Sequence, residues 1–151
     1  MQINDYIDIL LVEDNPHEAQ LTIRSFNQSK LANKLLHLSD GEEALDFIFA
    51  RNKYICRNVE NVPKLILLDL KLPKVSGMEI LKAIKEDNRT KIIPVIVLSS
   101  SQEEPDIISS YKLGVNSYIV KPVSFESFSK AVVEVGMYWI FLNVPPLSDG
   151  Q

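Results

Sequence analysis

The sequence contains a single cysteine, Cys56, which excludes an intramolecular disulfide bond. It also lacks any apolar run approaching the roughly 18–20 residues that a membrane-spanning helix needs. Because no apolar leader stands at the N-terminus, we expect a cytoplasmic protein without a membrane partner. An excess of positive charge is lacking too, because 16 lysines and arginines stand against 20 aspartates and glutamates, a formal net charge of -4. Nucleic-acid binding requires clustered lysine and arginine, so we expect no nucleic-acid partner.

Apolar stretches typical of buried parallel strands alternate with helical patterns along the 151 residues. The predicted strands span 7–12, 34–38, 65–69, 93–98 and 117–120. The predicted helices begin near residues 15, 40, 78, 104 and 124, and an irregular polar loop fills 51–63. Five such units predict an α/β fold, with a parallel sheet wound on both faces by helices. We expect one domain over 6–143, including an extension of the last helix, and a tail over 144–151.

Polar side chains close four of the predicted strands. Glu13 and Asp14 follow the first, Asp69 ends the third, Ser99 follows the fourth and Lys121 the last. The carboxyl ends of parallel strands meet at the edge where open α/β sheets place their active sites. We therefore expect these five residues to form one site.

The chemistry of these residues favours a phosphate and metal site. Three carboxylates offer the oxygen ligands that Mg²⁺ prefers, and the absence of cysteine and histidine from this cluster disfavours zinc. Asp69 can act as a nucleophile, because carboxylates form acyl phosphates. An incoming phosphoryl group needs positive charge and donors around it, which Lys121 and Ser99 supply.

Four motifs give the chain its resemblance to a known family. They are Val12-Glu13-Asp14-Asn15, Leu68-Asp69-Leu70-Lys71-Leu72-Pro73 with Ser76-Gly77, Pro94-Val95-Ile96-Val97-Leu98-Ser99, and Tyr118-Ile119-Val120-Lys121-Pro122. Over residues 6–135 the sequence resembles the receiver domains of two-component response regulators. Glu13 stands where aspartate is commoner and Ser99 where threonine is commoner; both keep the functional group.

This resemblance implies strand order 2-1-3-4-5, the flavodoxin-like arrangement, and a phosphorelay function. Asp69 would accept a phosphoryl group from a phosphohistidine of a sensor kinase. The resemblance assigns Mg²⁺ to Glu13, Asp14, Asp69 and the main-chain carbonyl of Lys71. It assigns the phosphoryl oxygens to Ser99 and Lys121. The protein would then be no enzyme beyond promoting its own phosphorylation and dephosphorylation.

The resemblance also implies two features of the last strand. A cis peptide bond would precede Pro122. On phosphorylation, Ser99 would move toward the phosphoryl group and Tyr118 would swing inward, as two packings of similar energy are biased by local contacts. The alternative for Tyr118 is a half-buried tyrosine of the core.

We expect no output domain after the last helix, so this helix suggests how the switch is read. Its apolar residues recur at steps of three and four: Phe125, Phe128, Val132, Val135, Trp139 and Leu142. The run 137–142 is apolar all round, which indicates burial on more than one side. We expect a homodimer through Phe128, Val132, Val135, Trp139 and Leu142. In the alternative, the extension folds back on its own domain.

The extended C-terminus and the loop 51–63 resemble those of single-domain regulators paired with phytochrome-type histidine kinases.

Three other functions are alternatives to a phosphoacceptor response regulator. A receiver-fold scaffold without phosphorylation would usually lose an acid or the lysine. A phosphatase of the haloacid dehalogenase type needs a second aspartate where Lys71 stands. A flavodoxin-like cofactor binder needs a phosphate loop where Glu13 and Asp14 stand.

Overall fold

The computed structural model describes residues 6–29, 34–100, 103–121, 124–144 and 146. The strands are β1 (Ile9–Val12), β2 (Leu35–Leu38), β3 (Leu65–Leu68), β4 (Val95–Ser99) and β5 (Ser117–Val120). The main helices are α1 (Pro16–Ser29), α2 (Gly41–Ile48), α3 (Gly77–Glu86), α4 (Glu104–Lys112) and α5 (Phe125–Met137). A short 3₁₀ helix, η1 (Asn52–Tyr54), follows α2, and a π-helical segment, η2 (Tyr138–Leu142), continues α5. Several strands begin one or two residues later than predicted.

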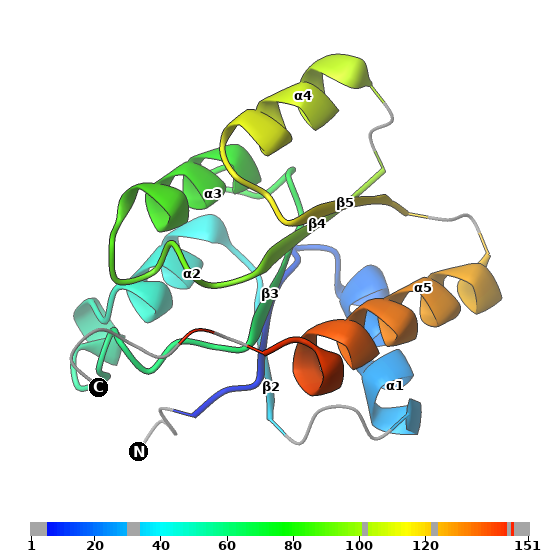
Figure 1. Cartoon of the computed structure of the whole chain (residues 1–151), viewed down its shortest axis with the longest axis horizontal. Helices are drawn as coiled ribbons and strands as arrows, with labels where there is room; N and C mark the ends of the chain where they lie inside the picture. Colours follow the sequence, from blue (N-terminus) through cyan, green and yellow to red (C-terminus); the bar gives the residue numbers. More distant parts are fainter. Residues whose placement is uncertain (1–5, 30–33, 101–102, 122–123, 145, 147–151) are drawn as a thin grey trace.

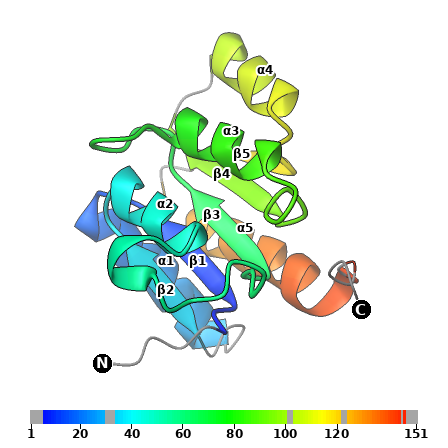
Figure 2. The same cartoon turned by 90° about the vertical axis from the view of Figure 1, so that its left-hand side faces the viewer.

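The strands form one parallel sheet in the order β2-β1-β3-β4-β5 (Figures 1 and 2), which confirms the predicted α/β fold class. Every residue of the central strands β1, β3 and β4 is buried. Their near-continuous apolar sequences follow from this position, because helices cover both faces of the sheet.

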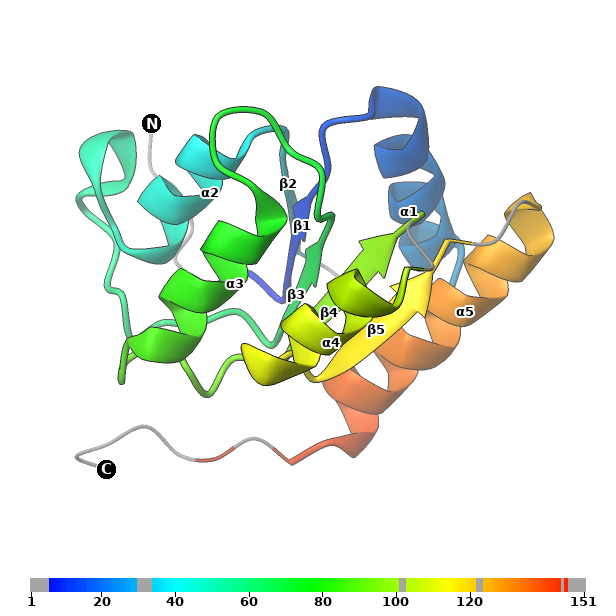
Figure 3. The same ribbon diagram turned by 90° about the horizontal axis from the view of Figure 1, so that it is seen from above.

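Two hydrophobic clusters, one on each face of the sheet, join the strands to the helices that cover them. Helices α1 and α5 lie together on one face, and α2, α3 and α4 lie on the other (Figures 1 and 3). Successive β1 residues alternate between the clusters, because side chains of a strand alternate in direction. Leu10 joins Phe47 and Ile80 on the α2–α3 side. Leu11 joins Phe26 on the α1–α5 side.

Side-chain caps fix the helix starts nearest the carboxyl edge of the sheet. The Asn15 side chain accepts from the backbone N–H groups of His17 and Glu18 at 3.0 and 3.1 Å, which places the start of α1 directly after the first acidic pair. Ser76 and Glu79 form a capping box at the start of α3. These caps satisfy backbone donors that the first helical turn leaves without partners.

The segment 51–63 is less irregular than predicted. It contains η1, and Tyr54 within it is buried, with its ring edge-on to Phe47 and its hydroxyl donating to Glu43 at 2.7 Å. The guanidinium group of Arg57 lies over the ring of Phe47, 3.9 Å from its centroid, and makes a cation–π contact. A single aromatic in a polar stretch therefore anchors the loop to α2.

Helix α5 corrects part of the prediction for the dimer. Phe128 and Val132 are buried in the α1–α5 cluster of their own chain, so neither is available to a partner. Val135 and Trp139 are half-buried against the same cluster. Leu142 is 69% exposed. The predicted stripe of steps three and four thus faces mainly the sheet, because an apolar helix face packs on whichever layer lies nearest.

Exposed apolar side chains nevertheless remain on the other side of this extension. They are Met137, Tyr138, Phe141, Leu142 and Val144. The segment therefore both folds back on its own domain through one face and leaves an apolar face in solvent.

Gly77 connects the fold to the acidic edge. A Cβ atom added there would lie 2.2 Å from the carbonyl oxygen of Asp69 and 2.6 Å from Cα of Leu70. The loop after β3 thus returns against the start of α3, held by a 2.9 Å hydrogen bond from Gly77 N to Leu70 O. Only glycine permits this approach without displacing the backbone of Asp69.

We predict that Gly77→Ala destabilises the protein by about 1–3 kcal/mol and also weakens divalent-cation binding, because the clash displaces Asp69. Gly114→Ala is the matched control. Gly114 has a φ of +99° and no neighbour closer than 3.4 Å to an added Cβ atom. Its substitution should cost about 1–2 kcal/mol without changing cation affinity. Urea unfolding measures the stability of each variant, and calorimetric titration measures its cation affinity. Equal cation affinities in the two variants would contradict a role of Gly77 in placing Asp69.

Candidate functional site

The register of the sheet brings the acidic residues together. Val12 of β1 lies beside Leu68 of β3, so the residues that follow them leave the sheet side by side. The backbone N–H of Asp69 donates to Val12 O at 3.0 Å. Carboxylate oxygens of Glu13, Asp14 and Asp69 lie within 4.8 Å of one another. The three predicted acids therefore form one cluster, in which Glu13 and Asp69 are buried and Asp14 is exposed.

Lys121 and Ser99 reach the same edge from the other half of the sheet. Ser99 pairs with Val120, and the backbone N–H of Lys121 donates to Ser99 O at 2.8 Å. The Lys121 ammonium lies 2.8 Å from Glu13 Oε1 and 3.6 Å from Asp69 Oδ2. Ser99 is 1% exposed at the end of β4. The five residues that the sequence predicted to share a site thus lie at one edge.

Glu18 is a member of this network that the sequence reasoning missed. Its Oε2 atom lies 2.8 Å from Nζ of Lys121, the same distance that separates this Nζ atom from Oε1 of Glu13. An acid in the first turn of a helix ordinarily interacts with the helix dipole, and that general preference hides a specific role. The signal was the spacing: Glu18 lies one helical turn beyond Asp14, on the helix that leaves the site.

The buried charges shift one another's proton affinity. Burial is the main cause that raises the pKa of Glu13 to about 8, and the neighbouring Asp69 adds to it while Lys121 opposes it. Burial acts to lower the pKa of Lys121, but its hydrogen bonds to Glu13 and Glu18 outweigh this and raise the pKa. Four acids, Glu13, Asp14, Glu18 and Asp69, surround the single Lys121 ammonium, an arrangement that suits a cation.

The other predicted residues are placed as follows. The backbone N–H of Lys71 lies 3.4 Å from Asp69 Oδ1, while the metal-ligand role of its carbonyl stays a prediction. Tyr118 is half-buried against the α2–α3 cluster. The peptide bond before Pro122 lies outside the described residues.

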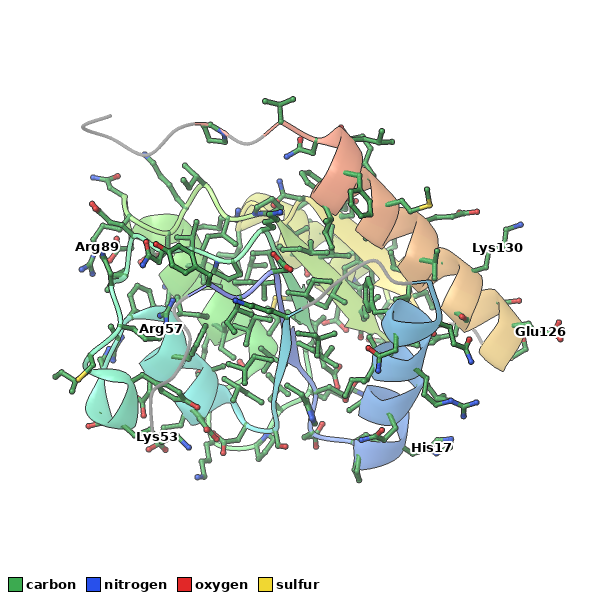
Figure 4. All side chains as sticks on the ribbon, turned by 90° about the horizontal axis from the view of Figure 1, so that it is seen from below. His17, Lys53, Arg57, Arg89, Glu126 and Lys130 are labelled. Carbon is green, nitrogen blue, oxygen red and sulfur yellow. The ribbon has the colours of Figure 1, made fainter. Side chains whose placement is uncertain are left out.

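The two histidines differ in their distance from the site. His37 Nε2 lies 2.7 Å from the carbonyl oxygen of Glu13, so this ring buttresses the backbone of an acidic residue. His17 is exposed and projects from the first turn of α1 (Figure 4).

Among the described residues, none of the helices is long and apolar enough to cross a membrane.

The fold and site geometry agree with a comparison against protein families, in which residues 9–133 match the response regulator receiver domain. The chain belongs to this family. A curated relative, the "Probable methanogenesis regulatory protein FilR2" of Methanothrix harundinacea, is 38% identical over 97% of this chain and 92% of its own length. This receiver assignment confirms the resemblance found in the motifs.

Two solved structures extend the comparison, one of a phytochrome response regulator and one of a metal-bound response regulator. The phosphorylated cyanobacterial phytochrome response regulator RcpA is 36% identical, with a TM-score of 0.86 over 94% of this chain and 99% of that one. The Mn²⁺-bound form of the response regulator Rcp1 is 37% identical, with a TM-score of 0.84 over 92% and 98%. The chain is thus a receiver domain with an acidic pocket, similar to phytochrome-associated regulators.

We predict that divalent-cation affinity rises with pH. A cation needs the Glu13 carboxylate, and the raised pKa of this group, about 8, means that a proton competes with the cation near neutral pH. Below pH 8 binding must release a proton, so affinity should rise by up to about tenfold per pH unit and level off above pH 8. Calorimetric titration with Mn²⁺ in buffers of different ionisation enthalpy counts the released protons.

Glu13→Gln is the control for this proton release. The amide keeps the size of the side chain and cannot titrate, so cation binding by this variant should be weaker and nearly independent of pH between 6 and 8. An unchanged pH slope in the variant would show that another group releases the proton.

Proposed function

We propose that Asp69 is the phosphoacceptor of a two-component phosphorelay and that a sensor histidine kinase is the donor. One observation carries this proposal. The Asp69 carboxylate stands between two other carboxylates and the Lys121 ammonium, at the carboxyl edge of a parallel sheet. The phosphorylated state of the similar regulator RcpA supports it.

The proposed reaction is a direct phosphoryl transfer. An Asp69 carboxylate oxygen attacks phosphorus, the bond from phosphorus to the kinase histidine nitrogen breaks, and the electron pair returns to the imidazole. Lys121 offers positive charge to one equatorial oxygen, and the Ser99 hydroxyl offers a hydrogen bond to another. The protein acts here as substrate and as the source of its own transfer groups.

The chemistry of the carboxylate cluster fits Mg²⁺. Three oxygen donors lie close together, and burial, with a smaller contribution from Asp69, raises the pKa of Glu13, so a bound dication would stabilise its charged form. Glu13, Asp14 and Asp69, with the Lys71 carbonyl, would hold it. When bound, Mg²⁺ neutralises charge that develops on the transferred phosphoryl oxygens. The Mn²⁺-bound form of Rcp1 supports the cation assignment.

The kinase in this proposal is of the phytochrome type, supported by the similarity to the phytochrome response regulator RcpA. Conformational signalling would run through Ser99 and Tyr118. Ser99 ends β4 and Tyr118 lies beside Val97 on the neighbouring strand. A shift of Ser99 toward a phosphoryl group would therefore act directly on the strand that carries Tyr118.

We predict that the wild-type protein gains one phosphoryl group when incubated with acetyl phosphate and Mg²⁺, and that Asp69→Asn gains none. The amide keeps the shape of the side chain but is not a nucleophile at this reaction. Intact mass spectrometry measures the change. Asp14→Asn, which removes an acid but keeps Asp69, should react more slowly without losing the site. An unmodified wild type would favour a phosphate-free scaffold.

The proposal includes a homodimer formed through the C-terminal extension of the 6–143 domain. Four exposed apolar side chains of this extension support it: Met137, Tyr138, Phe141 and Leu142. The rings of Tyr138 and Trp139 meet edge to face with centroids 5.0 Å apart, so an aromatic pair joins this surface to the chain's own core. Closed two-fold dimers are the commonest assembly of soluble proteins.

We predict that Leu142→Glu weakens the dimer at least about tenfold, because a carboxylate would be desolvated at the interface. Ile55→Glu is the control, since Ile55 is 71% exposed and follows η1, outside the extension. Sedimentation velocity over a range of concentrations measures both. A monomeric wild type, or equal dimerisation of wild type and Leu142→Glu, would remove the extension from the proposal.

A further inference from the structure

The Lys121 ammonium makes its two shortest contacts with glutamates and not with the proposed phosphoacceptor. Nζ lies 2.8 Å from Glu13 Oε1 and 2.8 Å from Glu18 Oε2, but 3.6 Å from Asp69 Oδ2. An ammonium group has three hydrogens to donate. Two of them are thus directed to acids other than Asp69.

Glu18 differs from Glu13 in its relation to the metal cluster. The carboxylates within 4.8 Å of one another are those of Glu13, Asp14 and Asp69, and Glu18 is not among them. A cation would compete with Lys121 for the oxygens of Glu13. It would leave the contact between Lys121 and Glu18 intact, so Glu18 is the acid that still holds Lys121 when the metal cluster is filled.

The fold positions both partners of the contact between Glu18 and Lys121. The backbone N–H of Glu18 is capped by the Asn15 side chain at 3.1 Å, and the next residue, Ala19, is fully buried against the sheet. The Lys121 side chain is 8% exposed and that of Glu18 36%. The lysine is therefore confined on the protein side, and Glu18 closes its solvent side.

We propose that Glu18 is a positioning residue that restrains Lys121 in the unphosphorylated protein and so slows phosphorylation of Asp69. This inference rests on the proposed phosphoacceptor function. A phosphoryl oxygen on Asp69 would compete with Glu18 for the hydrogens of the Lys121 ammonium, which lies 2.8 Å from Glu18 and 3.6 Å from Asp69. The Glu18 carboxylate also repels an approaching phosphoryl dianion.

The expected size of the effect follows from the exposure of Glu18. A partly exposed ion pair changes an equilibrium or a rate by about two- to fivefold. Glu18→Gln should therefore be phosphorylated about two- to fivefold faster by acetyl phosphate with Mg²⁺. It should bind beryllofluoride, a stable phosphoryl mimic, more tightly by a similar factor. Glu86→Gln, the same charge change at the exposed end of α3, should behave like wild type.

A second readout needs neither metal nor phosphate. In the wild-type protein the Lys121 ammonium protons should exchange slowly with water, because the group is buried and held by two carboxylates. In Glu18→Gln they should exchange faster, as measured by ¹⁵N-edited NMR of the lysine side chains. A general loss of structure would also change the backbone amide spectrum of α1, which separates local release from unfolding.

The outcomes are distinct. Faster phosphorylation, tighter beryllofluoride binding and faster ammonium exchange in Glu18→Gln support the inference. Equal or slower phosphorylation of Glu18→Gln than of a reactive wild type overturns it, as does unchanged ammonium exchange. A wild type that gains no phosphoryl group overturns the proposed function and, with it, the kinetic role of Glu18.

Discussion

Crowding of like charges at the carboxyl edge of the sheet is the constraint on which this site depends. The register that places Val12 beside Leu68 delivers Glu13 and Asp69 to adjacent positions, with Asp14 close by. Such an arrangement is costly for a folded protein, because buried carboxylates lose hydration and repel one another. The raised pKa of Glu13 is a direct consequence. Lys121 offsets part of this cost, and a dication would offset more.

The rest of the domain supplies the rigidity that this arrangement requires. Central strands buried on both faces hold the edge in register, and the close return of the chain at Gly77 fixes the backbone of Asp69. His37 from the edge strand β2 contacts the carbonyl oxygen of Glu13. The packing of the apolar strands thus stabilises the fold enough to offset the unfavourable free energy of the crowded carboxylates at the polar edge.

The sequence was sufficient for the features that depend on local pattern. Apolar runs predicted the strands, and polar residues at their ends predicted which side chains would meet, because parallel strands leave little choice. Features that depend on tertiary packing were missed. Tyr54 in a polar segment gave no sign of the pocket against Phe47. Glu18 resembled any first-turn acid, and only the fold places it against Lys121. The periodicity around Phe128 could not distinguish a partner from the chain's own sheet.

The layer formed by α1 and α5 links the site to the C-terminal extension. Lys121 follows β5 on the way to α5, while Glu18, its partner, lies on α1. These two helices share one hydrophobic cluster, which also includes Trp139 at the start of the extension. A phosphoryl group on Asp69 would compete with Glu18 of α1 for the Lys121 ammonium, and packed layers transmit such changes because their interiors are dense. A charge change at Asp69 therefore has a physical route to the α1–α5 side that does not pass through Ser99 and Tyr118.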